Sequence, residues 1–154
     1  MADTTTGPGT DDKAPDFDLP AAGAENIRLS AFAGKPVVLF FYPKAMTSGC
    51  TAESCHFRDL GAEFEALGAQ RVGISADPPE KQAKFDAKNS LGYPLLSDPD
   101  RAIAKELGAK RPGPLWNKRS TFVIDTDRTL LAEISSETNM DLHADEALEV
   151  LRNR

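Results

Sequence analysis

The chain has 154 residues, of which 40% are hydrophobic and 27% are charged, and its formal net charge at pH 7 is -6. This length and balance are typical of one soluble globular domain. The negative charge and the lack of a Lys/Arg cluster argue against nucleic-acid binding, and no apolar stretch reaches the roughly 18 residues of a membrane span. The first twelve residues lack the basic and apolar regions of a secretory signal, so we expect a cytoplasmic protein.

Residues 1–13 are rich in Thr, Gly, Pro and Asp and predict a mobile tail, followed by one domain over residues 14–154. Within this domain, short apolar runs alternate with stretches of helical spacing. The predicted strands are residues 26–29, 36–42, 71–76, 93–97, 120–125 and 130–135, and the predicted helices are residues 50–67, 78–88, 98–108 and 141–151. The last two strands are close enough in sequence to form a hairpin. This order predicts an α/β domain with a mixed central β-sheet flanked by helices.

Cys50 and Cys55 are the only cysteines, which is too few for a small secreted domain held together by disulfides. Cys50 follows a predicted buried strand and begins a predicted helix. The free N–H groups and partial positive charge at a helix N-terminus favour a thiolate, the reactive form of cysteine. The alternative is a buried cysteine that packs as a small hydrophobic residue, and position alone does not decide between the two.

The spacing of Cys50 and Cys55 argues against two ordinary roles for such a pair. On one regular helix their Cα atoms would be roughly 8–9 Å apart, beyond the ~7 Å limit for a disulfide without backbone movement. The pair is not C-x-x-C and has no second pair of ligands, so the sequence predicts no zinc site. A disulfide between these cysteines therefore requires the first turns of the helix to unwind.

The sequence around the two cysteines resembles the signature of the peroxiredoxins, and specifically of the peroxiredoxin Q, or bacterioferritin comigratory protein, subfamily. Pro43, Thr47 and Cys50 fit the family element Pro-x-x-x-Thr/Ser-x-x-Cys. Cys55 lies where the subfamily often carries a second cysteine. The resemblance extends over about residues 14–154, and it implies a thioredoxin-like fold and a thiol peroxidase.

The resemblance also implies a role for each residue of the site. Cys50 would attack the peroxide and become a sulfenic acid, which Cys55 would resolve to an intramolecular disulfide. Thr47 would orient the peroxide, Arg119 would stabilise negative charge, and Pro43 would shield the sulfenate. The implied partners are a hydroperoxide, either hydrogen peroxide or an organic one, and thioredoxin or a similar dithiol reductant. Family members of this type are often monomers, so a monomer is expected.

These residues also have simpler interpretations. Thr47 would serve as a helix cap, Pro43 as a strand terminator and Arg119 as a surface residue at the start of a strand. Other residues are expected to have no catalytic part: the exposed Glu53, His56 and His143, and Trp116, which would pack within the loop of residues 109–118.

The chain departs from the subfamily pattern at two positions near Cys50. It has Ala45 where Asp is common and Ser48 where Pro is common. Neither is a catalytic position of the family. Because a chain with Ser has more unfolded conformations than one with Pro, we expect local unfolding around Cys50 to be easy.

Two other functions stay open. A thioredoxin-like thiol–disulfide oxidoreductase would need a C-x-x-C pair, which this sequence lacks. A redox-sensing module, in which oxidation of Cys50 signals to a partner, would use the same thiolate chemistry and is not excluded. The sequence contains no metal, flavin, haem or nucleotide motif, so no cofactor is expected.

Overall fold

The computed structural model describes residues 12–22, 25–32, 34–111 and 117–154. The strands are β1 (Asp18–Leu19), β2 (Ile27–Arg28), β3 (Val37–Phe41), β4 (Gln70–Ser75), β5 (Leu95–Ser97), β6 (Ser120–Ile124) and β7 (Leu130–Ser135). The helices are α1 (Ser48–Asp59), α2 (Gly61–Ala66), α3 (Pro79–Asn89), α4 (Ala102–Leu107) and α5 (Met140–Arg152), with the 3-10 helix η1 (Leu29–Phe32).

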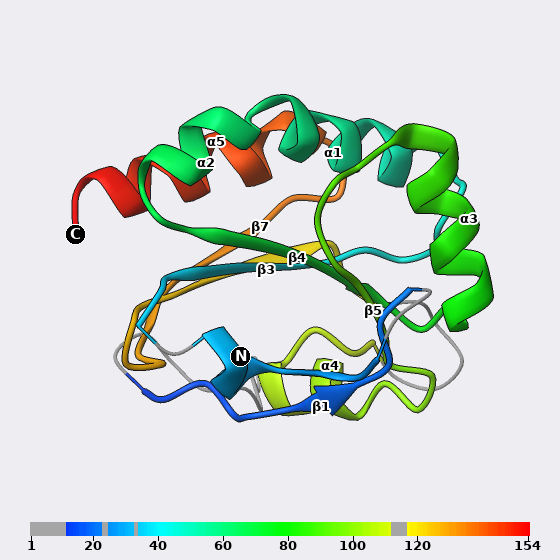
Figure 1. The fold of residues 1–154 in the computed structure, drawn as a ribbon, viewed down its shortest axis with the longest axis horizontal. Coiled ribbons are helices and arrows are strands. Elements are labelled where there is room, and N and C mark those ends of the chain that lie inside the picture. Colours follow the sequence, from blue (N-terminus) through cyan, green and yellow to red (C-terminus); the bar gives the residue numbers. More distant parts are fainter. Residues whose placement is uncertain (1–11, 23–24, 33, 112–116) are drawn as a thin grey trace.

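Five of the strands form a mixed sheet in the order β5-β4-β3-β6-β7. β3 is parallel to β4 and antiparallel to β6, and β6 pairs antiparallel with β7. The predicted hairpin of the last two strands is therefore confirmed. The mixed sheet with helices on both faces confirms the predicted α/β class (Figure 1).

The central strand β3 separates two hydrophobic layers. Figure 1 shows α1, α2 and α5 above the sheet and α4 below it. Successive side chains of a strand point to opposite faces, and Phe40 accordingly packs with the helices above while Phe41 packs with the residues below. Phe40 stacks on Phe57 of α1 with ring centroids 4.2 Å apart, which holds α1 against the sheet.

The helix predicted over residues 50–67 is two helices, and the first begins at Ser48. The break at Leu60 lies beside Arg71, whose Nη1 donates to the carbonyl of Phe57 at 2.9 Å. A Cβ atom at Gly61 would lie only 3.0 Å from the same guanidinium, so glycine leaves room for it. This contact comes from β4, the strand that follows α2, and helical spacing alone could not predict it.

The N-terminal part of the described chain is attached to the edge of the sheet. Lys13 pairs with Thr129 as an isolated bridge, and the amide of Leu130 donates to the carbonyl of Asp12 at 2.8 Å. Residues 1–11, which make up most of the predicted tail, lie outside the described residues, as does Trp116. Over the part of the chain that is described, no helix is long and apolar enough to cross a membrane.

Candidate active site

Cys50 lies in the first turn of α1, and its side chain is fully buried. The segment that joins β3 to α1 is held by Asp77, whose Oδ2 accepts from the amide of Ala45 at 2.7 Å and from the hydroxyl of Ser75 at 2.7 Å. Ser75 is the last residue of β4, so the sheet fixes where α1 starts. The predicted position of Cys50 at a helix N-terminus is confirmed.

Arg119 places a buried cation beside the Cys50 sulfur. Its Nη1 lies 3.4 Å from Cys50 Sγ and 2.8 Å from Glu53 Oε1. Arg119 directly precedes β6, the neighbour of β3, and is only 6% exposed, so the interpretation as a surface residue is wrong. A Cβ atom at Gly49 would lie 3.2 Å from Arg119 Nη2, so glycine here leaves space for the guanidinium.

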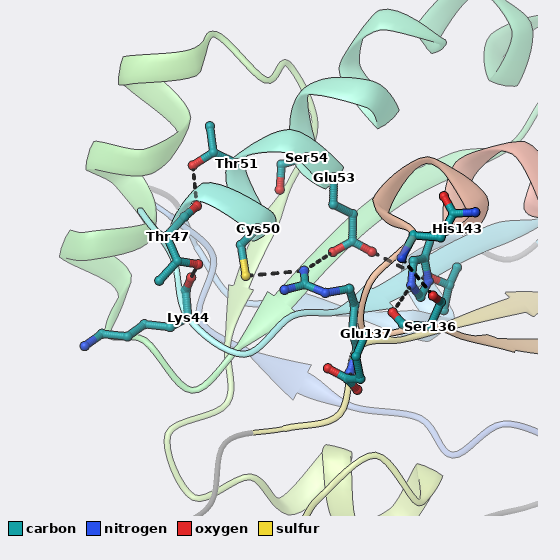
Figure 2. Close-up of polar contacts among 12 residues, drawn as sticks. Lys44, Thr47, Cys50, Thr51, Glu53, Ser54, Ser136, Glu137 and His143 are labelled. Atoms are coloured by element: carbon teal, nitrogen blue, oxygen red, sulfur yellow. Dashed lines mark hydrogen bonds and ion pairs between the residues drawn. The ribbon is translucent and has the colours of Figure 1, made fainter.

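The expectation that Glu53 is an exposed carboxylate is wrong, because its side chain is 0% exposed. It lies three residues after Cys50, on the same face of α1, and Figure 2 shows it pointing toward His143. Burial raises the pKa of Glu53 to about 8, although the charge of Arg119 acts in the opposite direction. Its Oε2 has no hydrogen-bond partner among the described residues.

His143 is also buried, at 0% exposure, so the expectation of an exposed histidine is wrong. Its Nε2 lies 2.9 Å from the carbonyl of Ser136, and since a carbonyl only accepts, Nε2 carries the hydrogen. Its Nδ1 then accepts from the hydroxyl of Thr121 at 2.7 Å and lies 3.6 Å from Glu53 Oε2. Burial lowers the pKa of His143.

One signal in the sequence could have located His143. The buried positions of α5 repeat at helical spacing, and the same stripe passes through position 143. The members of this stripe are His143, Ala144, Ala147, Leu148 and Leu151.

Thr47 occupies the N-cap position of α1, but its side chain makes no capping hydrogen bond. Its hydroxyl instead donates to the carbonyl of Lys44 at 2.7 Å, as Figure 2 shows. The simple capping interpretation is therefore wrong. Pro43 lies in the same segment, two residues beyond the end of β3, and is half-buried.

Cys55 shares α1 with Cys50, and both are free thiols. Cys55 is partly exposed, and its Sγ lies 3.7 Å from Asn89 Oδ1 at the end of α3. The neighbouring His56, expected at the surface, is only 25% exposed, and its Nε2 lies 2.8 Å from Asp145 of α5. The described residues hold no group of three or more His, Cys, Asp or Glu that could bind a metal ion.

Comparisons with known proteins show the family of this chain. Residues 10–132 match the model of the AhpC/TSA family. The peroxiredoxin Bcp of Bacillus subtilis is 39% identical over 147 residues, which cover 92% of this chain and 93% of that protein. Among solved structures, the peroxidoxin BcpB of Mycobacterium tuberculosis has a TM-score of 0.89 and 53% identity, covering 94% of this chain and 96% of that one.

A third comparison, with the bacterioferritin comigratory protein of Xanthomonas campestris, gives a TM-score of 0.84 at 30% identity over 89% of this chain and 90% of that one. That protein has alkyl peroxide reduction activity. The fold of this chain is therefore thioredoxin-like, as it is in these peroxiredoxins. The comparisons favour a peroxidase over a redox-sensing module. The chain belongs to the AhpC/TSA family, and it is a peroxiredoxin of the Bcp and peroxiredoxin Q type, a thiol-dependent peroxidase that acts on peroxides.

Proposed function

We propose that Cys50 is the peroxidatic cysteine and Cys55 the resolving cysteine in the reduction of hydrogen peroxide and organic hydroperoxides. The observation that carries this proposal is the 3.4 Å contact between Arg119 Nη1 and Cys50 Sγ. A buried, fixed guanidinium favours a thiolate over a neutral thiol, and it also stabilises the charge that develops on the leaving oxygen. Cys55 is partly exposed, and its sulfur contacts an amide oxygen, while the guanidinium that acts on it is that of Arg58, which is not buried.

In the first step, the Cys50 sulfur attacks the terminal oxygen of the peroxide. A sulfur–oxygen bond forms, the oxygen–oxygen bond breaks, and the leaving alkoxide or hydroxide takes a proton and departs as an alcohol or water. The hydroxyl hydrogen of Thr47 is engaged by the carbonyl of Lys44, so the lone pairs of Oγ1 are available to accept a hydrogen bond from the peroxide. Pro43 would limit the access of water to the sulfenic acid.

In the second step, the Cys55 sulfur attacks the sulfenic acid, a disulfide forms and water departs. Because both cysteines lie on α1, this step requires the helix to unwind between them. A dithiol reductant such as thioredoxin then exchanges with the disulfide, which restores both thiols and oxidises the reductant. A supply of reduced dithiol is typical of the cytoplasm, where we place the protein.

The support for organic hydroperoxides comes from the Xanthomonas relative and its alkyl peroxide reduction activity. Peroxide turnover coupled to thioredoxin and its reductase tests the proposal with the intact chain and two variants. We expect Cys50→Ser to lose turnover completely. We expect Cys55→Ser to consume about one equivalent of peroxide and then stop, because its sulfenic acid has no internal partner.

The outcomes separate the two assignments. Turnover by Cys50→Ser would overturn the peroxidatic role, and normal turnover by Cys55→Ser would overturn only the resolving role. If the intact chain consumes stoichiometric peroxide with reductant in excess, then it is a sensor and not an enzyme.

A further inference from the structure

Glu53 lies on the segment of α1 that must unwind before the two sulfurs can meet. It stands between Cys50 and Cys55 in sequence, and its side chain is 0% exposed in the helical form. Unwinding of this segment would therefore move the carboxyl group of Glu53 from the buried interior into water. The protonation of this carboxyl group is thereby coupled to whether α1 is wound or unwound between the two cysteines.

The surroundings of Glu53 compensate a buried negative charge only on one of its two oxygens. Oε1 accepts from Arg119 Nη1 at 2.8 Å, and the same nitrogen also contacts Cys50 Sγ. Oε2 has no hydrogen-bond partner among the described residues, and a carboxylate oxygen left in this state is costly. A proton on Oε2 removes the charge, and this oxygen lies 3.6 Å from Nδ1 of His143, which already accepts a hydrogen bond from Thr121.

Several charged or titratable groups surround Glu53 from different elements. They are Cys50 on α1, Tyr93 before β5, Arg119 before β6, Glu137 between β7 and α5, and His143 on α5. Of these, the guanidinium of Arg119 is the cation in direct contact with the carboxyl group.

We propose that Glu53 is a proton-linked latch on α1: opening of the helix between the cysteines exposes its carboxyl group, which then releases a proton to water. This proposal rests on the proposed pairing of Cys50 with Cys55, because that pairing is the reason for the helix to open. The latch makes the resolving step easier as the pH rises. It thus shortens the time for which the sulfenic acid is open to further oxidation.

The direction of the effect follows from proton linkage. In the closed helix the pKa of Glu53 is raised to about 8 by burial, and on exposure it returns toward its ordinary value of 4.5. Between these values the closed form binds more protons than the open form, so rising pH favours opening. The protonated carboxyl group stabilises the closed helix fully when the pH is below the pKa of the exposed Glu53. This stabilisation is lost as the pH rises through the pKa of the buried Glu53.

His143 would act with the opposite sign, and this distinguishes the two residues. Burial lowers the pKa of His143, so exposure would raise it toward 6.5 and the open form would take up a proton. Opening controlled by His143 would therefore be favoured by falling pH. Only release of a proton from an acid such as Glu53 gives opening that increases with pH.

Hydrogen–deuterium exchange of the full chain measures the opening directly. All samples carry Cys50→Ser and Cys55→Ser, which removes both thiol titrations and prevents disulfide formation. Protection factors for the amides of residues 51–56, corrected for the intrinsic exchange rate, are compared between about pH 6 and pH 8. We expect them to fall by about tenfold per pH unit in the middle of this range, as the release of one proton requires.

Two further variants in the same background identify the titrating group. Glu53→Gln keeps the shape of the side chain but cannot ionise, so its protection factors should not change with pH. Asp59→Asn, a matched change at an exposed carboxylate on the same helix, should retain the full slope. The amides of β3 serve as an internal reference for global stability.

The latch would be overturned if the protection factors of the double serine variant stayed constant or rose with pH. It would also be overturned if they still fell tenfold per pH unit in Glu53→Gln. These measurements contain no thiol, so they do not depend on the peroxidase chemistry. If the slope is present but wild-type protein forms no Cys50–Cys55 disulfide, then the resolving role is wrong and the latch stands. If the disulfide forms but the slope is absent, then only the latch is wrong.

Discussion

Buried charge around Cys50 distinguishes this thiol from a cysteine that merely fills space. A buried ion is costly unless it is paired, and Arg119 is paired through one nitrogen with both Cys50 and Glu53. With Glu53 protonated, the carboxyl group in contact with Arg119 is neutral, and the Cys50 sulfur is the other group that Nη1 contacts. The protonation of Glu53 thus decides whether the positive charge of Arg119 is shared with a carboxylate or acts on the sulfur alone.

Replacement of Arg119 by Met should lower kcat/KM for peroxide by roughly 100-fold or more, because a preorganised donor to the developing charge is lost. Stopped-flow measurement of the oxidation rate tests this. Arg28→Met, which removes an exposed arginine paired with Asp18, is the matched control and should react normally. An Arg119→Met protein that reacts at the wild-type rate would exclude this residue from the peroxide step.

Thr47 offers a second test with a conservative rescue. Thr47→Val removes the hydroxyl and keeps the shape, and we expect a loss of tens-fold in kcat/KM, as for one hydrogen bond to a charged or reacting group. Thr47→Ser restores the hydroxyl and should recover most of the rate. Equal rates in the Val and Ser variants would show that the hydroxyl does not contact the peroxide.

The helix α1 has to be stable enough to position Cys50, yet its first turns must be able to unwind when the disulfide forms. Several contacts fasten it to its neighbours. Tyr93 donates from its hydroxyl to the carbonyl of Ser54 at 2.8 Å, and Arg58 donates to the carbonyl of Asn89 at 2.7 Å. The resolving step would have to disturb the first of these, because Ser54 lies between the two cysteines.

Ser48→Pro should make α1 harder to open. Ser48 is the first residue of the helix, where proline is accepted, and Thr47 before it has φ -82° and ψ 156°, the extended shape that a residue before proline adopts. The closed form should gain about 0.4–1 kcal/mol, which slows disulfide formation roughly two- to five-fold. Quenched-flow trapping of the disulfide measures the rate.

Ser48→Ala, which does not restrict the backbone, controls for loss of the hydroxyl and should not slow the reaction. The expected easy unfolding around Cys50 can be checked by hydrogen exchange of the amides of residues 48–56 in the reduced wild-type protein. If those amides exchange as slowly as the central strands, then the expected easy unfolding around Cys50 is wrong.

At the scale of the whole molecule, the sheet brings distant segments of the chain to one site. β3 leads into the loop before α1, β6 carries Arg119 to the same edge, and α5 covers the site with His143. Among the described residues, Met46, at 41% exposure, is the only large hydrophobic side chain that is exposed. Stable assembly normally needs a larger apolar surface than this.

We therefore expect a monomer of 16.6 kDa in both the reduced and the oxidised states. Light scattering coupled to size-exclusion chromatography at micromolar concentration measures the mass. A mass of two chains in either state would contradict the expectation, and a change of mass on oxidation would point to an interface near α1.

The sequence by itself determined the order of strands and helices, because apolar periodicity reports which faces are buried. It also indicated Cys50 and the residues around it, because the motif is local. The tertiary structure showed that Glu53 and His143, which were expected at the surface, are buried, and it placed Arg119, whose role only the family resemblance implied, beside Cys50. The burial of a charged side chain depends on what packs across from it, and those partners lie far apart in the chain: 69 positions separate Arg119 from Cys50, and His143 lies still further from Glu53.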